Sequence, residues 1–353
     1  MQQIIEKISR TLTELAEEKS GKPQGVWIKR YQVEENFTKN QFLAFLKPEA
    51  TAVLDKVNVA EILQFVFNAF QCYNVEVRAI RILTNGYLQQ YRIMDNHYGI
   101  ISSISRRGFD AISADAREAL EKTFESDLHS GGKILGGHQF LEHYPQFSPF
   151  ALSTISDNLG PKKLASGTYC LRLVLDGKIL LILNAFHPYQ LEKFTKRGAA
   201  IIVLEAVSST SWRIVRQQLV GATDPFKAAE GSLRYTFLKQ RNELGLPTVN
   251  LSNNGIHLSA GPLEGMIEVQ NFFSEYEKGI KLSFQETCFG RLILSKGLHH
   301  KSLTELATNP SFKEGERAVS SFDLTEEIDS EAAAEKLIEM CESQYTAAVS
   351  KDE

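Results

Sequence analysis

Strand-sized apolar runs alternate with helical patterns along most of this chain, and this alternation restricts the fold more than any other feature. Short apolar runs are typical of strands, and apolar residues spaced three and four apart are typical of helices. The longest runs, at 179–183 and 199–204, are too short to cross a bilayer. We expect strands at 42–46, 75–82 and 199–207, helices at 57–70, 88–94 and 211–220, and a final strand at His257. This order is compatible with an α+β fold built on a ferredoxin-like βαββαβ antiparallel sheet.

Further segments surround this core of residues 40–275. The N-terminal extension, 1–39, has a helical apolar face that we expect to pack on the core, with contact to another subunit as the alternative. An insertion at about 99–183 contains a helical stretch and a hairpin signal, Asp176-Gly177 between two apolar runs. The C-terminal extension, 276–353, predicts a strand at 286–296, a loop at 308–329 and an amphipathic helix at 332–345.

A glycine-rich stretch at 131–138 lies within the insertion. It resembles a phosphate-binding loop, but it lacks the order of residues that such a loop requires, and no clear strand precedes it. We therefore expect a surface loop there.

Bulk properties exclude several classes of protein. The net charge of −4 and the pI of about 6.1 argue against a protein that coats nucleic acid. The four cysteines lack metal-binding spacing, which favours reduced thiols in a cytoplasmic protein. The charged N-terminal segment has no signal-peptide core. We expect a cytoplasmic protein with neither a membrane nor a nucleic acid as its partner.

One histidine stands in a pattern suited to chemistry. Asn254-Gly-Ile-His257-Leu-Ser259 is followed by a helical pattern that carries Glu268 among apolar positions. Neutral imidazole is a nucleophile at physiological pH, and a carboxylate on its other ring nitrogen fixes the tautomer. A buried carboxylate needs a partner, so Glu268 either pairs with His257 or faces solvent. Taken alone, His257 is one of eight histidines, and a structural role is the simpler interpretation.

Other short motifs stand in a fixed order around this histidine. They are Lys47-Pro48-Glu49 after the first strand, Gly221-Ala-Thr223-Asp-Pro225, and Gly231-Ser-Leu-Arg234. Together with Asn254, His257 and Glu268, they resemble the nucleoside diphosphate kinase family. The motifs of that family are, in order, a strand followed by Lys-Pro-Asp, then Gly-x-Thr-x-Pro, Gly-x-x-Arg, and Asn-x-x-His-x-Ser with a later Glu. The resemblance covers about 40–98 and 184–275.

The resemblance implies a phosphotransferase that moves the γ-phosphate of a nucleoside triphosphate to a nucleoside diphosphate through a phosphohistidine. His257 would be the nucleophile, and Glu268 would orient it. Magnesium would be carried by the nucleotide phosphates, and a homo-oligomer is expected. The nucleotide-binding residues implied are Lys47, Thr223, Arg234 and Asn254. Each has a simpler alternative: Lys47 as a turn lysine, Thr223 as a turn cap, Arg234 as a surface arginine and Asn254 as a turn residue.

Several positions depart from the family pattern. Gln217 stands where the family has an arginine, with Arg216 beside it, and Ala260 replaces an aspartate. In the family an aromatic residue stacks on the nucleotide base, and Phe186 and His187 are both candidates for that position. Tyr91 is the candidate for the family's active-site tyrosine. These departures keep a second hypothesis open, namely a catalytically impaired nucleotide-binding or scaffold protein on the same fold.

Overall fold

A computed structural model of the protein describes residues 1–18, 22–246, 248–314 and 317–349. The chain divides into two compact units. The first unit combines residues 1–91 with 197–353, and the second contains residues 92–196, a range that includes the predicted insertion. Helices and antiparallel strand pairs occur in both units, so the fold is α+β.

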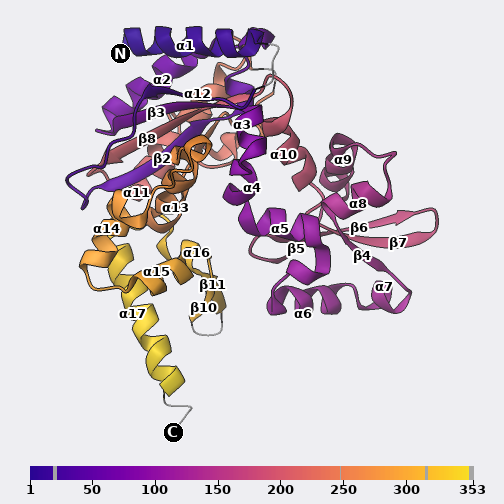
Figure 1. The fold of residues 1–353 in the computed structure, drawn as a ribbon. Helices are drawn as coiled ribbons and strands as arrows, with labels where there is room; N and C mark the ends of the chain where they lie inside the picture. The colour runs from indigo at the N-terminus through magenta and orange to yellow at the C-terminus, as the bar shows by residue number, and fades with distance from the viewer. Residues whose placement is uncertain (19–21, 247, 315–316, 350–353) are drawn as a thin grey trace. The chain divides into compact units, whose positions relative to one another are not determined.

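The first unit is built on a five-stranded sheet, here called the main sheet, in which every neighbouring pair is antiparallel. Figure 1 shows its strands β2, β8 and β3 side by side. Its order is β1-β3-β8-β2-β9, so β1 and β9 are the edges. The predicted strands at 42–46, 75–82 and 199–207 are confirmed, whereas β1 was not predicted. The strands are β1 (Gly25–Lys29), β2 (Asn40–Leu46), β3 (Glu76–Thr84), β8 (Ala200–Ser208) and β9 (Ile256–Leu258).

Helices cover both faces of the main sheet because its inner strands are apolar on both sides. Along β2, Phe42 and Leu46 join the core formed with α1, α2 and α12, whereas Phe45 contacts Phe272 of α13 on the opposite face. The helices of this part are α1 (Gln2–Glu17), α2 (Val59–Cys72), α3 (Asn85–Gln90), α11 (Trp212–Ile214), α12 (Leu233–Lys239) and α13 (Pro262–Phe273). A π-helical segment, Val215–Val220, continues α11.

The N-terminal helix confirms the prediction from its apolar spacing. Ile5, Ile8 and Leu12 of α1 are at most 2% exposed and belong to the core of the main sheet. Helix α1 therefore packs on its own chain, as expected.

Two predictions for the C-terminal extension are wrong. Residues 286–296, predicted as strand, form α14 (Cys288–Ser295), whose N-terminus is capped by Thr287. The predicted loop at 308–329 contains a hairpin of β10 (Ser311–Glu314) and β11 (Arg317–Ser320), followed by α16 (Ser321–Thr325). The remaining helices are α15 (His300–Leu306) and α17 (Ser330–Val349). Helix α17 confirms the predicted amphipathic helix, since Ala333 and Leu337 are fully buried against α13 and α14.

The second unit has a four-stranded sheet of order β4-β7-β6-β5. The predicted hairpin is confirmed as β6 and β7, with Asp176 and Gly177 at φ 48° and 74° in its turn. Its strands are β4 (Lys133–Gly136), β5 (Lys162–Ala165), β6 (Thr168–Leu175) and β7 (Lys178–Leu183). Its helices are α4 (Ile93–His97), α5 (Gly99–Arg107), α6 (Ala114–Thr123), α7 (Glu125–His129), α8 (Gly137–His143), α9 (Pro149–Leu159) and α10 (His187–Thr195). Within the described ranges, no helix of either unit has both the length and the apolar character needed to cross a membrane.

The glycine-rich stretch at 131–138 is not the surface loop that we predicted. Residues 133–136 of this stretch form strand β4, which pairs in parallel with β7 and leads directly into α8. A Cβ atom on Gly136 would lie 2.3 Å from the carbonyl oxygen of Ser105, and one on Gly137 would lie 2.8 Å from that of Asn184. These glycines are therefore explained by close backbone packing inside the second unit.

Candidate functional site

Strand β9 is short, and the turn before it determines where it begins. Gly255 has φ of 77°, and a Cβ atom there would lie 2.7 Å from the ring of Phe237. Only glycine fits this conformation and this space. The carbonyl oxygen of Gly255 accepts from Lys47 N at 2.9 Å, which starts the pairing of β9 with β2.

The structure brings His257 and Glu268 together. His257 lies opposite Phe45 on β2, and their rings stack with centroids 4.6 Å apart. Its Nε2 lies 2.7 Å from Oε1 of Glu268 on α13. The imidazole is 19% exposed and the carboxylate is 4% exposed. Because the carboxylate can only accept a hydrogen bond from Nε2–H, this arrangement favours the tautomer in which Nδ1 carries the lone pair.

Ser259 completes the arrangement from the strand side. Its hydroxyl donates to Glu268 Oε2 at 2.5 Å, and it accepts from Leu43 N at 3.1 Å. Both oxygens of the buried Glu268 carboxylate are therefore hydrogen bonded, which is the condition for burying a charge at tolerable cost. The sequence indicated Ser259 only as part of the motif around His257, and the cap position of α13 is Gly261.

A second carboxyl lies one turn earlier on α13. Glu264 Oε2 accepts from Ala260 N at 3.1 Å. Burial of its carboxyl, and then the negative charge of Glu268, raise the pKa of Glu264 well above its usual range. The residue keeps some exposed surface, but the carboxyl itself lies deep. We did not predict this neighbour, although a spacing of four along a helix was a visible signal for it.

Arg234 is a buried residue and not the surface arginine of the simpler interpretation. It is 7% exposed, and its guanidinium donates to the carbonyl oxygens of Gly221 at 2.8 Å and Ile256 at 3.0 Å. Burial, and then the charge of Arg216, lower the pKa of Arg234 to about 10. In this structure two guanidinium nitrogens of Arg234 therefore bind backbone carbonyl oxygens.

Asn254 ties the turn before β9 to the segment that carries Thr223. Its Nδ2 donates to the carbonyl oxygen of Thr223 at 2.9 Å, whereas its buried Oδ1 has no hydrogen-bond partner among the described residues. Thr223 itself is exposed, and the turn that follows it is capped by Asp224 instead. Thr223 is therefore not the turn cap of the simpler interpretation.

Lys47 follows β2 directly and is partly exposed. Its Nζ lies 3.4 Å from the carbonyl oxygen of Ser252, in the same turn that contains Asn254. The predicted residues therefore converge on β9 and on the turns at its beginning, although they come from segments far apart in the sequence.

The positions that depart from the family pattern contact the C-terminal extension. Arg216 bonds Glu326 at 2.8 Å, and Gln217 bonds Glu327 at 2.6 Å. The carbonyl oxygen of Ala260 accepts from Glu327 N at 2.9 Å.

Two of the aromatic candidates have local structural roles. His187 is fully buried within the second unit, where its Nδ1 lies 3.0 Å from Gln190 Oε1, so its ring faces are covered. Tyr91, in the first unit, stacks on Tyr276 with centroids 5.7 Å apart. Phe186 is partly exposed and packs edge-on against Tyr169.

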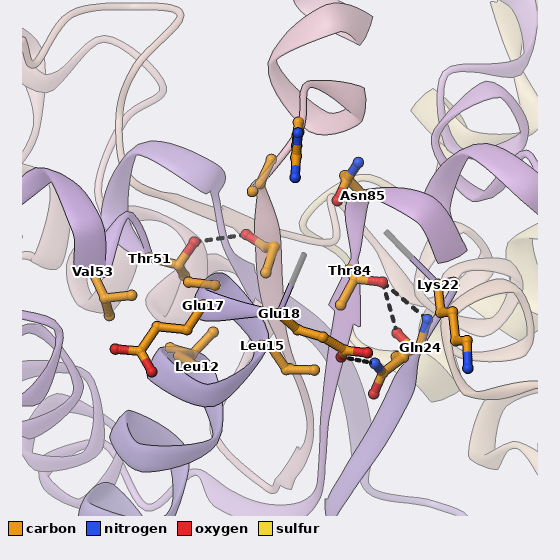
Figure 2. Close-up of a pocket in the computed structure, with 15 residues that line it drawn as sticks. Leu12, Leu15, Glu17, Glu18, Lys22, Gln24, Thr51, Val53, Thr84 and Asn85 are labelled. Atoms are coloured by element: carbon orange, nitrogen blue, oxygen red, sulfur yellow. Dashed lines mark hydrogen bonds between the residues drawn. The ribbon is translucent and has the colours of Figure 1, made fainter. Parts of the chain in front are cut away.

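A cavity of about 190 Å³ in the first unit lies elsewhere (Figure 2). It is bounded by the C-terminal part of α1, the end of β3 and the start of β8. Its two threonine hydroxyls are bonded within the protein, Thr51 to the carbonyl oxygen of Ala200 and Thr84 to Gln24. None of the six predicted site residues lines it. The cavity is therefore separate from the site at β9.

Comparisons with solved structures give matches, among them two at 16% identity. No protein-family model matches the chain, and no curated protein matches it in sequence. Among solved structures, it is similar to a nucleoside-diphosphate kinase from Borrelia burgdorferi, in a transition state mimic with bound vanadate and ADP. That match has 16% identity and a TM-score of 0.32, and covers 70% of this chain and 92% of the other. It is also similar to an NDP kinase from Pyrobaculum aerophilum, with 16% identity, a TM-score of 0.33, and coverage of 68% and 98%. The function therefore has to be inferred from the side chains of this chain.

Proposed function

We propose that this protein is a phosphotransferase in which His257 carries the phosphoryl group from a nucleoside triphosphate to a nucleoside diphosphate. The observation that carries the proposal is the Nε2 to Oε1 distance of 2.7 Å between His257 and the buried Glu268. A carboxylate at that position supports positive charge on the ring while Nδ1 attacks.

The reaction has two displacements. In the first, the lone pair on Nδ1 of His257 attacks the γ-phosphorus, the bond to the β–γ bridging oxygen breaks, and the nucleoside diphosphate leaves. In the second, a terminal phosphate oxygen of another nucleoside diphosphate attacks the phosphohistidine, and the N–P bond breaks. Magnesium would be carried by the nucleotide phosphates, which suits its preference for phosphate oxygens and water.

Other residues near β9 support a nucleotide as substrate. Lys47 supplies a positive charge beside the turn at 252–255, and the exposed hydroxyl of Thr223 lies in the segment bonded to Asn254. The buried Oδ1 of Asn254 is an acceptor without a partner among the described residues, and a sugar hydroxyl is a suitable donor for it. The roles of these residues, and a phosphate contact of Arg234, stay predictions.

Labelling tests the proposal directly. We expect the protein, incubated with Mg²⁺ and ATP labelled at the γ-phosphate, to take up label that is lost in acid and kept in alkali. His257→Ala should abolish the label, and His299→Ala, which removes an exposed histidine, is the matched control. Glu268→Gln should slow labelling on the order of a hundredfold or more, because it removes the charge that supports the imidazolium. An unlabelled wild type, or equal labelling of His257→Ala, would contradict the mechanism.

A second candidate function is nucleotide binding without turnover. It is favoured by the contacts of Arg216 and Gln217 with Glu326 and Glu327, because side chains paired in this way are not directed at a phosphate. Calorimetry would distinguish the two functions: binding of a nucleoside diphosphate without any labelling of His257 selects this one.

We further infer that β2, α2, β3, β8, the α11 helix with its π continuation and β9 form a ferredoxin-like core. The order β9-β2-β8-β3 and the antiparallel pairing support this assignment. A homo-oligomer stays a prediction, which light scattering on the purified protein would test.

A further inference from the structure

Strand β9, which carries His257, is an edge of the main sheet. Gly255 and Ser259 direct their backbone groups to β2, since the carbonyl of Gly255 accepts from Lys47 N and Ser259 N donates to the carbonyl of Leu43. Backbone groups alternate in direction along a strand. The carbonyl oxygens of Ile256 and Leu258 therefore point to the open side of the edge.

Two arginines donate hydrogen bonds to these outward carbonyl oxygens. Arg234 donates to Ile256 at 3.0 Å, and Arg216 donates to Leu258 at 3.4 Å. Unpaired edge groups are a weak point of a sheet, and a strand of only three residues has few bonds of its own to hold it. The two guanidinium groups therefore fix β9 from the side opposite β2.

Arg216 is held in turn by the C-terminal extension. Its guanidinium lies 2.8 Å from Glu326 Oε1 and 3.6 Å from Glu327 Oε1. Burial, and then the charge of Arg216, lower the pKa of Arg234, so the two guanidinium groups lie close enough to affect each other.

The backbone of the extension contacts the end of β9 as well. Glu327 N donates to the carbonyl oxygen of Ala260 at 2.9 Å. A Cβ atom on Gly261 would lie 2.3 Å from the carbonyl oxygen of Thr325, so the two segments are in direct contact. Asp329 Oδ1 adds bonds to Trp212 N at 2.7 Å and Asn40 Nδ2 at 2.9 Å, which anchor the extension to the start of α11 and to β2.

We propose that Glu326 and Glu327 of the C-terminal extension position the nucleophile: they hold Arg216 against the carbonyl of Leu258, and thereby fix the edge strand that presents His257 to Glu268. This inference rests on the proposed function for its kinetic consequence. Arg216 is then a positioning residue. Gln217, which stands where the family has an arginine, belongs to the same contact with the C-terminal extension, because it bonds Glu327.

Hydrogen exchange tests the positioning without any need for activity. In the double variant Glu326→Gln/Glu327→Gln, we expect protection of the amides of segment 255–260 to fall by about tenfold, because a fixed edge becomes free to open locally. Glu335→Gln is the matched control, since it removes a carboxylate of the same extension that pairs with Lys296, the residue that follows α14. Unchanged protection of 255–260 in the double variant would overturn the proposal.

Kinetics separates positioning from phosphate binding. In the double variant and in Arg216→Ala, we expect the single-turnover rate of His257 phosphorylation at saturating nucleotide to fall about tenfold, with nucleotide affinity unchanged. Loss of affinity in Arg216→Ala at an unchanged rate would make Arg216 a phosphate ligand. Faster labelling of the double variant would make the contact autoinhibitory. Either result overturns the proposal.

The two experiments also separate this proposal from the proposed function. If the wild type takes no label, the phosphotransferase mechanism fails, while exchange at 255–260 still shows whether Glu326 and Glu327 fix β9. If the wild type is labelled and the double variant matches Glu335→Gln in both exchange and rate, the positioning proposal alone fails.

Discussion

Replacing Glu205 by glutamine should remove most of the pH dependence of stability that this buried carboxyl causes. Glu205 is fully buried in the central strand β8. Its Oε1 accepts from Gln41 Nε2 at 2.8 Å, and its Oε2 has no hydrogen-bond partner among the described residues. Burial is the main cause that raises the pKa of Glu205 from 4.5 to about 7. Nearby Arg78 and Lys29 oppose this increase only in part.

The sign and size of the effect follow from linkage. Since the pKa is higher in the folded state, the unfolded chain releases this proton first, and the free energy of unfolding falls as pH rises from 4.5 through 7. The interval from 4.5 to about 7 corresponds to about 3 kcal/mol, at about 1.4 kcal/mol for each pH unit. Stability from this group is therefore complete below pH 4.5 and is lost by about pH 8.

Urea unfolding between pH 5 and 8 measures this difference. Trp27 and Trp212 lie in the same unit as Glu205, so their fluorescence reports its unfolding. Glutamine keeps an acceptor for Gln41 but buries an amide, which costs about 1–2 kcal/mol at every pH. We therefore expect the stability of Glu205→Gln, relative to wild type, to rise by about 2.5 kcal/mol from pH 5 to 8, because part of the effect lies below pH 5.

Glu76→Gln is the matched control, because it removes a carboxylate that is 58% exposed on the neighbouring strand β3. Its stability relative to wild type should not change with pH in this way. The stability difference between Glu205→Gln and wild type should change with pH. If it changes by less than about 1 kcal/mol between pH 5 and 8, the argument from burial is refuted.

Three further changes test individual contacts. Gly261→Ala should lower the free energy of unfolding by about 1–3 kcal/mol, because its Cβ atom would meet the backbone of Thr325 at 2.3 Å. Gly99→Ala, with open space around its Cβ, is the control, and equal urea midpoints would contradict the prediction. Ser259→Ala should slow labelling of His257 by about tenfold, because Glu268 loses a hydrogen bond, and an unchanged single-turnover rate would count against it. Arg81→Lys should cost about 3 kcal/mol in urea unfolding, because lysine cannot reproduce the bonds of this fully buried guanidinium to Ser274, Tyr87 and Glu277. A loss below about 1 kcal/mol would show that these bonds can be replaced.

Local patterns in the sequence were enough to predict the main elements of the fold. The helical spacing of Ile5, Ile8 and Leu12 predicted the buried face of α1, and Asp176-Gly177 predicted the β6–β7 turn. The apolar run at 199–207 predicted β8, which is buried along its whole length. In these cases the signal lies within a few neighbouring residues, so no tertiary contact is needed to interpret it.

Predictions failed where a short segment depends on its surroundings. The apolar stretch in 286–296 fits strand or helix by pattern alone, and the cap at Thr287 was the overlooked helix signal. Strand β4 is four residues long and exists because it pairs with β7, about 45 residues further along the chain.

The candidate site shows the same limit. The pairing of His257 with Glu268 was one of two alternatives left open, since their spacing of 11 crosses from a strand to a helix. The contact of Arg216 with Glu326 joins residues 110 apart, and no local pattern indicates it. Such contacts follow from the tertiary fold and not from neighbouring sequence.

The position of β8 between β2 and β3 has a consequence for synthesis on the ribosome. Those two strands are made early, but neither can pair with its inner neighbour until residues 200–208 have left the exit tunnel. Thr84 ends β3 and Ala200 begins β8, so at about 5–20 residues per second the delay is roughly 6–23 seconds. During that time the apolar strand β2 has no partner in the main sheet. We therefore expect nascent chains that stop before residue 200 to be held by chaperones, and chains that extend well past residue 258 to be released.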